Sequence, residues 1–290
     1  MIAQNNNLHL VGVDIGATNV RAGLIYNDEI ISFCANKLPI DKNYESVLDT
    51  IFETIDKVFI PEVKAIGIGV PSVVDRKSGI VYNVQNIPSW VEVPLKSILE
   101  KKYRRNTIVN NDANCFALGE RLYGKGQKYA NFVGLAIGTG VGGGIINQGK
   151  LLYDVNCGSG EFGEISYLDG RYEDYCSGVF FKNKYNTNGE ELFKRAAFGD
   201  TNALKIAYEF GYHLGKLIQT ILFAVDPEAI IIGGSIAKSA KYYENAMAES
   251  IKNFTYPKSI EKLSIEFTQD NKIQLMGSAA LYLNEIARLV

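Results

Sequence analysis

The sequence has few of the features that direct a protein to a membrane, to nucleic acid or out of the cell. Gly, Asp or Pro interrupts every apolar run, and the first residues, MIAQNNNLH, lack the charged and apolar regions of a signal peptide. The formal net charge is −2, from 30 Lys and Arg against 32 Asp and Glu, so no nucleic-acid or anionic-membrane partner is indicated. We expect a cytoplasmic protein.

Cysteine is also scarce. Cys34, Cys115, Cys157 and Cys176 lie far apart, and none forms a CxxC pair. This spacing favours buried thiols over disulfides or a zinc knuckle. In contrast, 47% of the 290 residues are hydrophobic, as is ordinary for a globular protein with a substantial core. That length allows one large domain or two moderate ones, and we expect two.

Two stretches share one layout of strand, Gly/Thr bend, strand, short turn and strand. They are VGVDIGATNVRAGLIYNDEI (residues 11–30) and VGLAIGTGVGGGIINQGKLL (residues 133–152). Asn27 and Asp28 form the short turn of the first copy. The repeat predicts a duplicated α/β domain. Further along the chain, helical spacing predicts a helix over 207–225, which Pro227 ends, and a closing helix over 277–290.

The two Gly/Thr bends are candidate phosphate-binding loops. Residues 138–143 match the pattern GxGxxG, but that dinucleotide fingerprint must open a helix and here it continues as a strand. We therefore exclude a Rossmann dehydrogenase. A glycine-rich bend lets backbone N–H groups and a Thr hydroxyl approach phosphate oxygens. An ordinary hairpin turn would explain either bend alone, whereas two copies favour phosphate binding.

The stretch IVNNDAN, from Ile108 to Asn114, lies where a predicted strand becomes a helix. Capping of the first helical turn is one explanation for Asn110, Asn111 and Asp112. The other is a ligand site, because α/β sheets bind ligands at the carboxyl ends of their strands. Amides can orient hydroxyl groups, and a carboxylate can accept a proton. The predicted phosphate loops elsewhere favour the second explanation.

Three further features point to a nucleotide and a polar ligand. Asp14, which has Ala136 as its counterpart in the second copy, suits a Mg²⁺ site beside a polyphosphate, although a turn cap is the alternative. Gly233, Gly234 and Ser235 end a predicted strand and offer a close approach to the adenosine part of a nucleotide. The loop over 158–177 carries more carboxylates than a solvated loop requires.

Seven motifs follow one another in a specific order. They are DIGATNVR (14–21), VPSVVD (70–75), QNIPSW (85–90), NNDAN (110–114), IGTGVGGG (137–144), GSGEFGE (158–164) and IIIGGS (230–235). In this order they resemble the ROK family of bacterial sugar kinases, repressors and open reading frames, over almost the whole chain. The resemblance implies an α/β fold of the two-lobed, actin-like ATPase (ribonuclease H-like) type, with an active-site cleft between the lobes. We expect an N-terminal lobe over 1–113, completed by the helix 277–290, and a C-terminal lobe over 114–276.

The resemblance also implies an activity, namely ATP-dependent phosphorylation of the 6-hydroxyl of a glucose-like aldohexose or an N-acyl hexosamine. Asp112 matches the catalytic base, and Asp14 is expected to hold Mg²⁺ through water. The expected sugar contacts are Asn86, Asn111, Asp112, Glu161, Glu164 and Glu173. The expected nucleotide contacts are Asp14, Gly16, Ala17, Thr18, Asn19, Gly138, Thr139, Gly140, Gly233, Gly234 and Ser235.

The sequence also departs from the family pattern. Glu164 stands where the family usually has a zinc-ligating His that touches the sugar, and the Cys-rich loop that follows is missing, which leaves Cys176 alone. A single Cys cannot build a tetrahedral site, so we expect no zinc. The change to Glu164 leaves the identity of the hexose open.

Several alternatives remain. A non-catalytic sugar-binding regulator of the same family would need neither Asp14 nor Asp112, and a DNA-binding repressor would need a basic recognition module that is not visible. An actin-like ATPase that hydrolyses ATP without sugar would leave the carboxylates over 161–173 without a purpose. Polyphosphate could replace ATP as donor, because the bends recognise phosphate and not adenine. A homodimer would fit the family.

Overall fold

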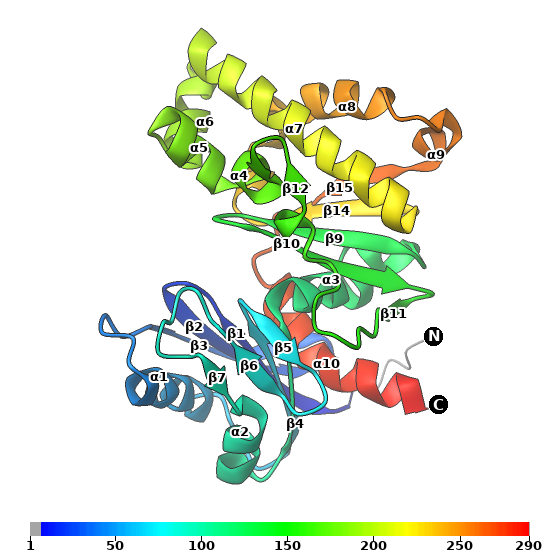
Figure 1. Cartoon of the computed structure of the whole chain (residues 1–290). Coiled ribbons are helices and arrows are strands. Elements are labelled where there is room, and N and C mark those ends of the chain that lie inside the picture. Colours follow the sequence, from blue (N-terminus) through cyan, green and yellow to red (C-terminus); the bar gives the residue numbers. More distant parts are fainter. Residues whose placement is uncertain (1–6, 290) are drawn as a thin grey trace. The chain divides into compact units, whose positions relative to one another are not determined.

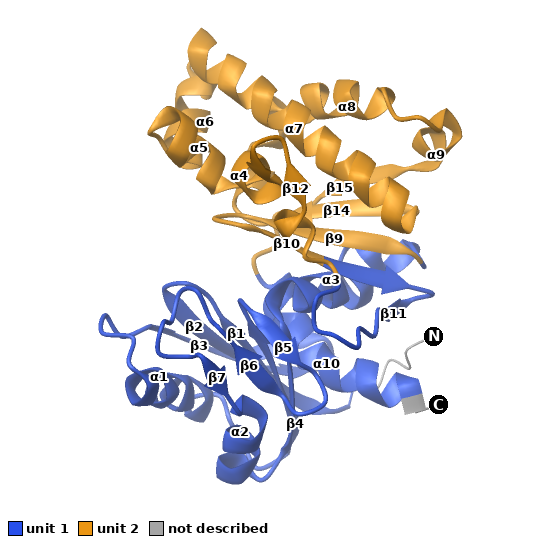
Figure 2. Ribbon diagram, viewed as in Figure 1, with its two compact units in different colours: residues 1–130, 144–159, 272–290 blue, residues 131–143, 160–271 orange. Residues whose placement is uncertain are grey.

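The protein forms two compact units in a computed structural model that describes residues 7–289 (Figure 2). The first six residues, on which the expected cytoplasmic location partly rests, lie outside the described range. Unit 1 contains residues 1–130, 144–159 and 272–290, and unit 2 contains residues 131–143 and 160–271. No helix of the described residues is both long and apolar enough to cross a membrane.

The core of unit 1 is a five-stranded sheet with the strand order β3-β2-β1-β4-β8 (Figure 1). Its strands are β1 (His9–Ile15), β2 (Asn19–Tyr26), β3 (Glu29–Lys37), β4 (Val63–Val70) and β8 (Asn106–Asn111). The first three strands are antiparallel, and β1, β4 and β8 are parallel. Asn27 and Asp28, both with positive φ, form the tight turn between β2 and β3 that the sequence predicts.

Helices cover both faces of this sheet. Alternate strand residues such as Val11 and Ile66 belong to the core under α1 (Tyr44–Asp56) and α2 (Leu95–Tyr103). On the other face, Leu10 and Ala65 pack against α10 (Ile273–Leu289), which also contacts α3 (Asp112–Tyr123). A small three-stranded sheet, formed by β5 (Val73–Asp75), β6 (Ile80–Tyr82) and β7 (Glu92–Val93), completes the unit.

The units divide the chain at residues other than the predicted 113/114 and 276/277. Helix α3 remains with unit 1 because its backbone is in direct contact with α10. A Cβ placed on Gly277 would lie 1.8 Å from the carbonyl oxygen of Cys115, and one on Gly119 would lie 2.1 Å from that of Ile273. Two helices that approach this closely form one packed layer.

The second five-stranded sheet has the order β11-β10-β9-β14-β15. Its strands are β9 (Phe132–Ile137), β10 (Val141–Asn147), β11 (Lys150–Leu151), β14 (Ala229–Gly233) and β15 (Ser264–Phe267). Strand β9 lies between β10 and two parallel strands, just as β1 lies between β2 and the parallel strands of the first sheet. The duplication predicted from the two repeats is therefore confirmed at the level of the sheets.

Helices make up most of unit 2. They are α4 (Tyr172–Cys176), α5 (Gly178–Tyr185), α6 (Gly189–Ala197), α7 (Thr201–Val225), α8 (Glu244–Lys252) and α9 (Pro257–Lys262). Short 3₁₀ turns lie at η1 (Lys125–Lys128, in unit 1), η2 (Phe162–Glu164) and η3 (Ile236–Tyr242), and the short strands β12 (Ser166–Tyr167) and β13 (Gly170–Arg171) pair. Helix α7 ends at Val225, as predicted, because Asp226 turns into the left-handed region before Pro227. It begins earlier than predicted because the Asp200 carboxylate caps its first turn.

The four cysteines are free thiols. Cys115 and Cys176 are buried, as predicted, whereas Cys34 and Cys157 are partly exposed. Burial raises the pKa of both buried thiols.

Candidate functional site

The polar residues at the β8–α3 junction have different roles at the start of the helix. Asn111 is the N-cap, since its Oδ1 accepts a hydrogen bond of 2.8 Å from the Ala113 N–H, and its Nδ2 donates to the Ser72 carbonyl. The buried Asn110 accepts hydrogen bonds from the Asn111 N–H and from Asn114 Nδ2. Asp112 follows as the first helical residue and is half-buried. Asn111 therefore supplies the side-chain cap, and Asp112 is the acidic residue of the first helical turn.

Strand register brings Asp14 to the same edge of the sheet as this junction. Asp14 pairs with Gly69 across β1 and β4, and Gly69 pairs with Asn110 across β4 and β8. A Cβ on Gly69 would lie 3.1 Å from both Cys115 Sγ and Ser278 Oγ, so the glycine lets α3 and α10 pack closely against the end of β4. Asp14 and Asp112 therefore both lie at the carboxyl ends of parallel strands, which is where such sheets bind ligands.

Asp14 is a buried carboxylate with two partners. Its side chain is 1% exposed; Gln274 Nε2 donates a 2.7 Å hydrogen bond to Oδ1, and a guanidinium nitrogen of Arg21 lies 3.1 Å from Oδ2. The contact with Arg21 is an ion pair without hydrogen-bond alignment, so Oδ2 keeps its capacity to accept. Burial raises the pKa of Asp14, and Arg21 and Gln274 oppose that rise.

The first Gly/Thr bend is open to a ligand. Ala17, Thr18 and Asn19 are exposed, and the Asn19 carboxamide donates to the Thr18 hydroxyl oxygen. The Gly16 N–H is already bonded to the Asn19 carbonyl at 2.9 Å, which fixes the shape of the bend. The exposed residues of the bend, and not the Gly16 N–H, are thus available for phosphate oxygens.

Sequence reasoning missed Lys42, which ties this bend to Asn86. Lys42 Nζ donates to the Asn86 carbonyl at 2.7 Å and to the Ala17 carbonyl at 3.3 Å. Ser89 Oγ in turn donates to the Lys42 carbonyl. A single Lys between a strand and a helix carries no sequence signal for such a contact. Asn86 itself is exposed, as a sugar contact needs to be.

In unit 2 the second bend contacts two other predicted segments. Glu173 Oε2 accepts a 3.0 Å hydrogen bond from the Val141 N–H, and a Cβ on Gly140 would lie 2.4 Å from the same oxygen. Gly234 has φ of +88° and leaves no room for a Cβ, which would lie 2.2 Å from the Ile137 carbonyl oxygen. Residues 138–140 and 233–235 therefore form one cluster with Glu173, and Thr139 at its centre is exposed.

The acidic loop of unit 2 is organised around Arg171, which the sequence analysis did not single out. Its guanidinium donates to both carboxylate oxygens of Glu164 and to Glu173. The hydrogen bonds that Arg171 donates to Glu164 raise the pKa of Arg171. Glu161, directly before η2, is half-buried and Glu164 is exposed. Among residues 7–289, no group of three or more His, Cys, Asp or Glu side chains is placed to hold a metal ion.

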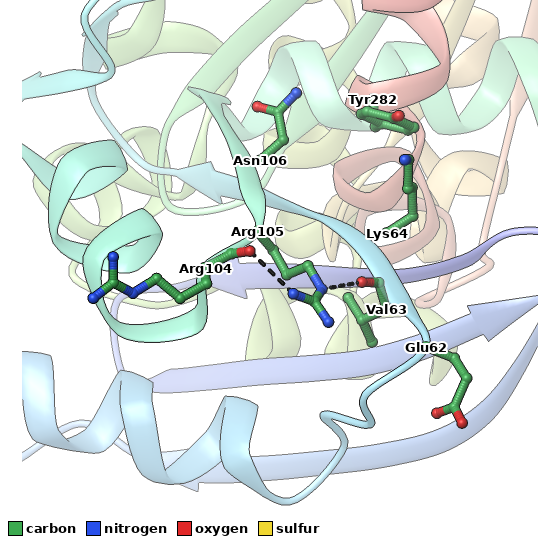
Figure 3. A pocket seen from close by; sticks show the side chains of 7 residues that line it. All are labelled: Glu62, Val63, Lys64, Arg104, Arg105, Asn106 and Tyr282. Carbon is green, nitrogen blue, oxygen red and sulfur yellow. Dashed lines mark hydrogen bonds between the residues drawn. The ribbon is translucent and has the colours of Figure 1, made fainter.

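A cavity of about 510 Å³ lies at the opposite edge of the sheet of unit 1, where β4 and β8 begin (Figure 3). Its lining residues are Glu62, Val63, Lys64, Arg104, Arg105, Asn106 and Tyr282. Arg105 donates to the backbone carbonyls of Val63, Pro61 and Arg104, and the Arg104 side chain extends away from it (Figure 3). None of the predicted site residues lines the cavity. The guanidinium of Arg105, which lies at its centre, is occupied by hydrogen bonds to backbone carbonyls.

Comparison with known proteins agrees with this geometry. A family model described as the ROK family matches residues 10–285. The chain belongs to the ROK family. This ROK protein is 29% identical over 282 residues to a glucokinase of Thermotoga maritima, covering 86% of this chain and 89% of that one. It is 31% identical to an N-acetyl-D-glucosamine kinase of Vibrio parahaemolyticus, covering 80% and 86% of the two chains.

A solved structure extends the comparison to the fold. The ROK family glucokinase from Streptomyces griseus, crystallised with glucose and AMPPNP, is 26% identical with a TM-score of 0.81, over 94% of this chain and 98% of that one. With the two similarly built sheets, this likeness confirms the predicted α/β, two-lobed actin-like fold.

Proposed function

We propose that this ROK protein is an ATP-dependent kinase that phosphorylates the 6-hydroxyl of a hexose, either a glucose-like aldohexose or an N-acyl hexosamine. The observation that carries the proposal is the position of Asp112. It lies at the edge where the parallel strands of unit 1 end, which is also the edge of Asp14, and Asn111 supplies the side-chain cap of α3. The relatives named glucokinase and N-acetyl-D-glucosamine kinase support both sugar classes.

Asp112 is proposed as the general base that accepts the proton of the attacking hydroxyl. A carboxylate suits this role because the hydroxyl proton leaves as its oxygen bonds to phosphorus. Asn86, Asn111, Glu161 and Glu173 are proposed to orient the sugar. Asn111 already uses one N–H and one lone pair within unit 1, so one of each remains for the sugar hydroxyls.

The two Gly/Thr bends are proposed to bind the phosphates of ATP, and residues 233–235 the adenosine part. Phosphoryl transfer passes through a loose transition state, so the protein mainly positions the reactants and neutralises charge. Asp14 fits a Mg²⁺ ion held through water, because Oδ2 has no hydrogen bond of its own. When bound, Mg²⁺ would neutralise part of the phosphate charge. The homodimer, the cytoplasmic location and the absence of zinc stay predictions.

The test is a panel of hexoses and hexosamines, each offered with Mg²⁺ and either ATP or polyphosphate, with detection of ADP and of sugar phosphate. At least one sugar is expected to be phosphorylated at its 6-hydroxyl with ATP. Silence across the panel, with retained sugar binding, would favour the non-catalytic regulator.

The role of Asp112 is tested by Asp112→Asn. We expect kcat to fall by roughly 10²–10⁴ while the sugar Kd changes little, because the base acts on the transition state and not on binding. Asp49→Asn, on the exposed side of α1, is the matched control. Full turnover by Asp112→Asn would remove the assignment.

A further inference from the structure

The loop over 160–177 of unit 2 collects carboxylates around one cation. Glu164, Glu173 and Asp174 come from η2 and α4, and each carboxylate lies within 4 Å of a nitrogen of Arg171. Carboxylates gathered around one cation repel one another, so a guanidinium that contacts all three helps to determine where each carboxylate lies. Arg171 is placed for this by β13, which ends at Arg171 directly before α4.

The three contacts differ in strength and direction. One guanidinium nitrogen of Arg171 donates to Glu164 at 2.7 Å and 2.5 Å, and the other lies 3.3 Å from Glu173 Oε1. The third, from Nε to Asp174, is longer at 3.9 Å, but the Arg171 N–H also donates to Asp174 at 3.0 Å. Glu164 is therefore the tightest partner, and Glu173 is the partner that reaches the second bend.

Glu173 connects Arg171 to the second bend. Its Oε1 faces Arg171, while its Oε2 accepts the Val141 N–H and packs against Gly140. A carboxylate has about four acceptor sites, and these two contacts use two of them. Glu173 thus keeps acceptor sites for sugar hydroxyls although its position is fixed from both sides.

The Arg171–Glu164 pair is too exposed to contribute much to stability. The Arg171 side chain is 38% exposed and that of Glu164 is 50% exposed, and ion pairs with such exposure add little to the free energy of unfolding. The side chain of Glu173, at 17%, is more buried. The Arg171–Glu164 pair therefore contributes more to the positioning of Glu173 than to the stability of unit 2.

We infer that Arg171 is a positioning residue for the sugar site: Glu164 anchors its guanidinium, and the guanidinium holds the Glu173 carboxylate against the second bend. This inference rests on the proposed function, in which Glu173 binds sugar. On this assignment Glu164 acts through Arg171 and does not itself contact the sugar. The two residues then form one unit, so their substitutions should not add.

The test is a double-mutant cycle read out as the sugar Kd by calorimetry without nucleotide, using a hexose that the wild type binds. Arg171→Met and Glu164→Gln are each expected to weaken binding about tenfold, and the double variant also about tenfold, because the second change removes nothing further. Arg171→Lys should recover part of the loss, since it keeps the charge without the planar fork. Unfolding temperatures should stay at the wild-type value.

Arg195→Met is the matched control, because Arg195 forms a similar exposed ion pair with Asp200 elsewhere in unit 2. It should bind sugar as the wild type does. A loss of about a hundredfold in the Arg171/Glu164 double variant would show that Glu164 contacts the sugar by itself and would overturn the inference. Wild-type affinity of Arg171→Met would overturn it as well.

The same measurements separate this inference from the proposed function. If the wild type binds sugar but transfers no phosphoryl group, the kinase assignment is wrong, but the double-mutant cycle can still be measured as sugar Kd values. A wild type that binds none of the hexoses would overturn both.

Discussion

Gly67 lies beneath α10, where the structure leaves no space for a side chain. A Cβ at this position would lie 1.8 Å from the Ser278 carbonyl oxygen and 2.7 Å from the Ser278 carbonyl carbon. Non-bonded heavy atoms prefer separations of about 3.5 Å, so in Gly67→Ala the helix would have to move by about 1.5 Å. Both groups belong to the backbone, and no rotamer change can relieve the overlap.

The expected destabilisation is large. Overpacking a core typically costs about 1–3 kcal/mol, and we place Gly67→Ala at the upper end, near 3 kcal/mol, because two backbones collide. At about 2–4 °C per kcal/mol, the unfolding temperature should fall by about 6–12 °C. Scanning calorimetry of the wild type and the variant measures this shift. Gly158→Ala is the control, since its Cβ would have no neighbour closer than 3.9 Å.

The same substitution should affect the site through α10. Gln274, on this helix, donates the 2.7 Å hydrogen bond to Asp14, and a displacement of about 1.5 Å would break it. ATP turnover by Gly67→Ala should therefore fall even at temperatures where the variant is fully folded. An unchanged unfolding temperature would refute the described packing of α10 on β4.

Two further predictions concern charges in unit 1. Because burial raises the pKa of Asp14, the native state binds more protons than the unfolded state from about pH 4, the ordinary pKa of Asp, up to the raised native value. The Asp14 contribution to stability is thus complete below that window and is lost as pH rises through it. The unfolding temperature of Asp14→Asn, measured over the same pH range, should not show this loss. A pH dependence parallel to that of the wild type would contradict the prediction. Lys42→Met removes the hydrogen bonds to Ala17 and Asn86 and should lower kcat/KM for the sugar about tenfold. Lys57→Met, at the exposed end of α1, is the control and should leave kcat/KM for the sugar unchanged. Equal kcat/KM values for the two variants would exclude a role for Lys42.

Part of this protein can be predicted from the sequence because the cause is local. The turn at Asn27 and Asp28 and the stop of α7 before Pro227 depend on neighbours within a few residues. The cap formed by Asn111 is also local, and capping was one of the two explanations that the sequence left for it. The two bends and the β8–α3 junction were found in the same way, since glycine and strand patterns mark them. The repeat predicted a duplicated α/β domain, and the strand order that the two sheets share became visible in the structure.

Tertiary structure alone decided which side chains meet. Gln274 contacts Asp14 across 260 residues of sequence, and Lys42 contacts Asn86 across 44 residues, so no local sequence pattern predicts either contact. Arg171 lies close in sequence to Glu164 and Glu173, yet its charge is aimed at them only because β12 and β13 fold the loop back. Periodicity determines that a segment is a strand or a helix, whereas the partners of a polar side chain depend on the register and packing of the whole sheet.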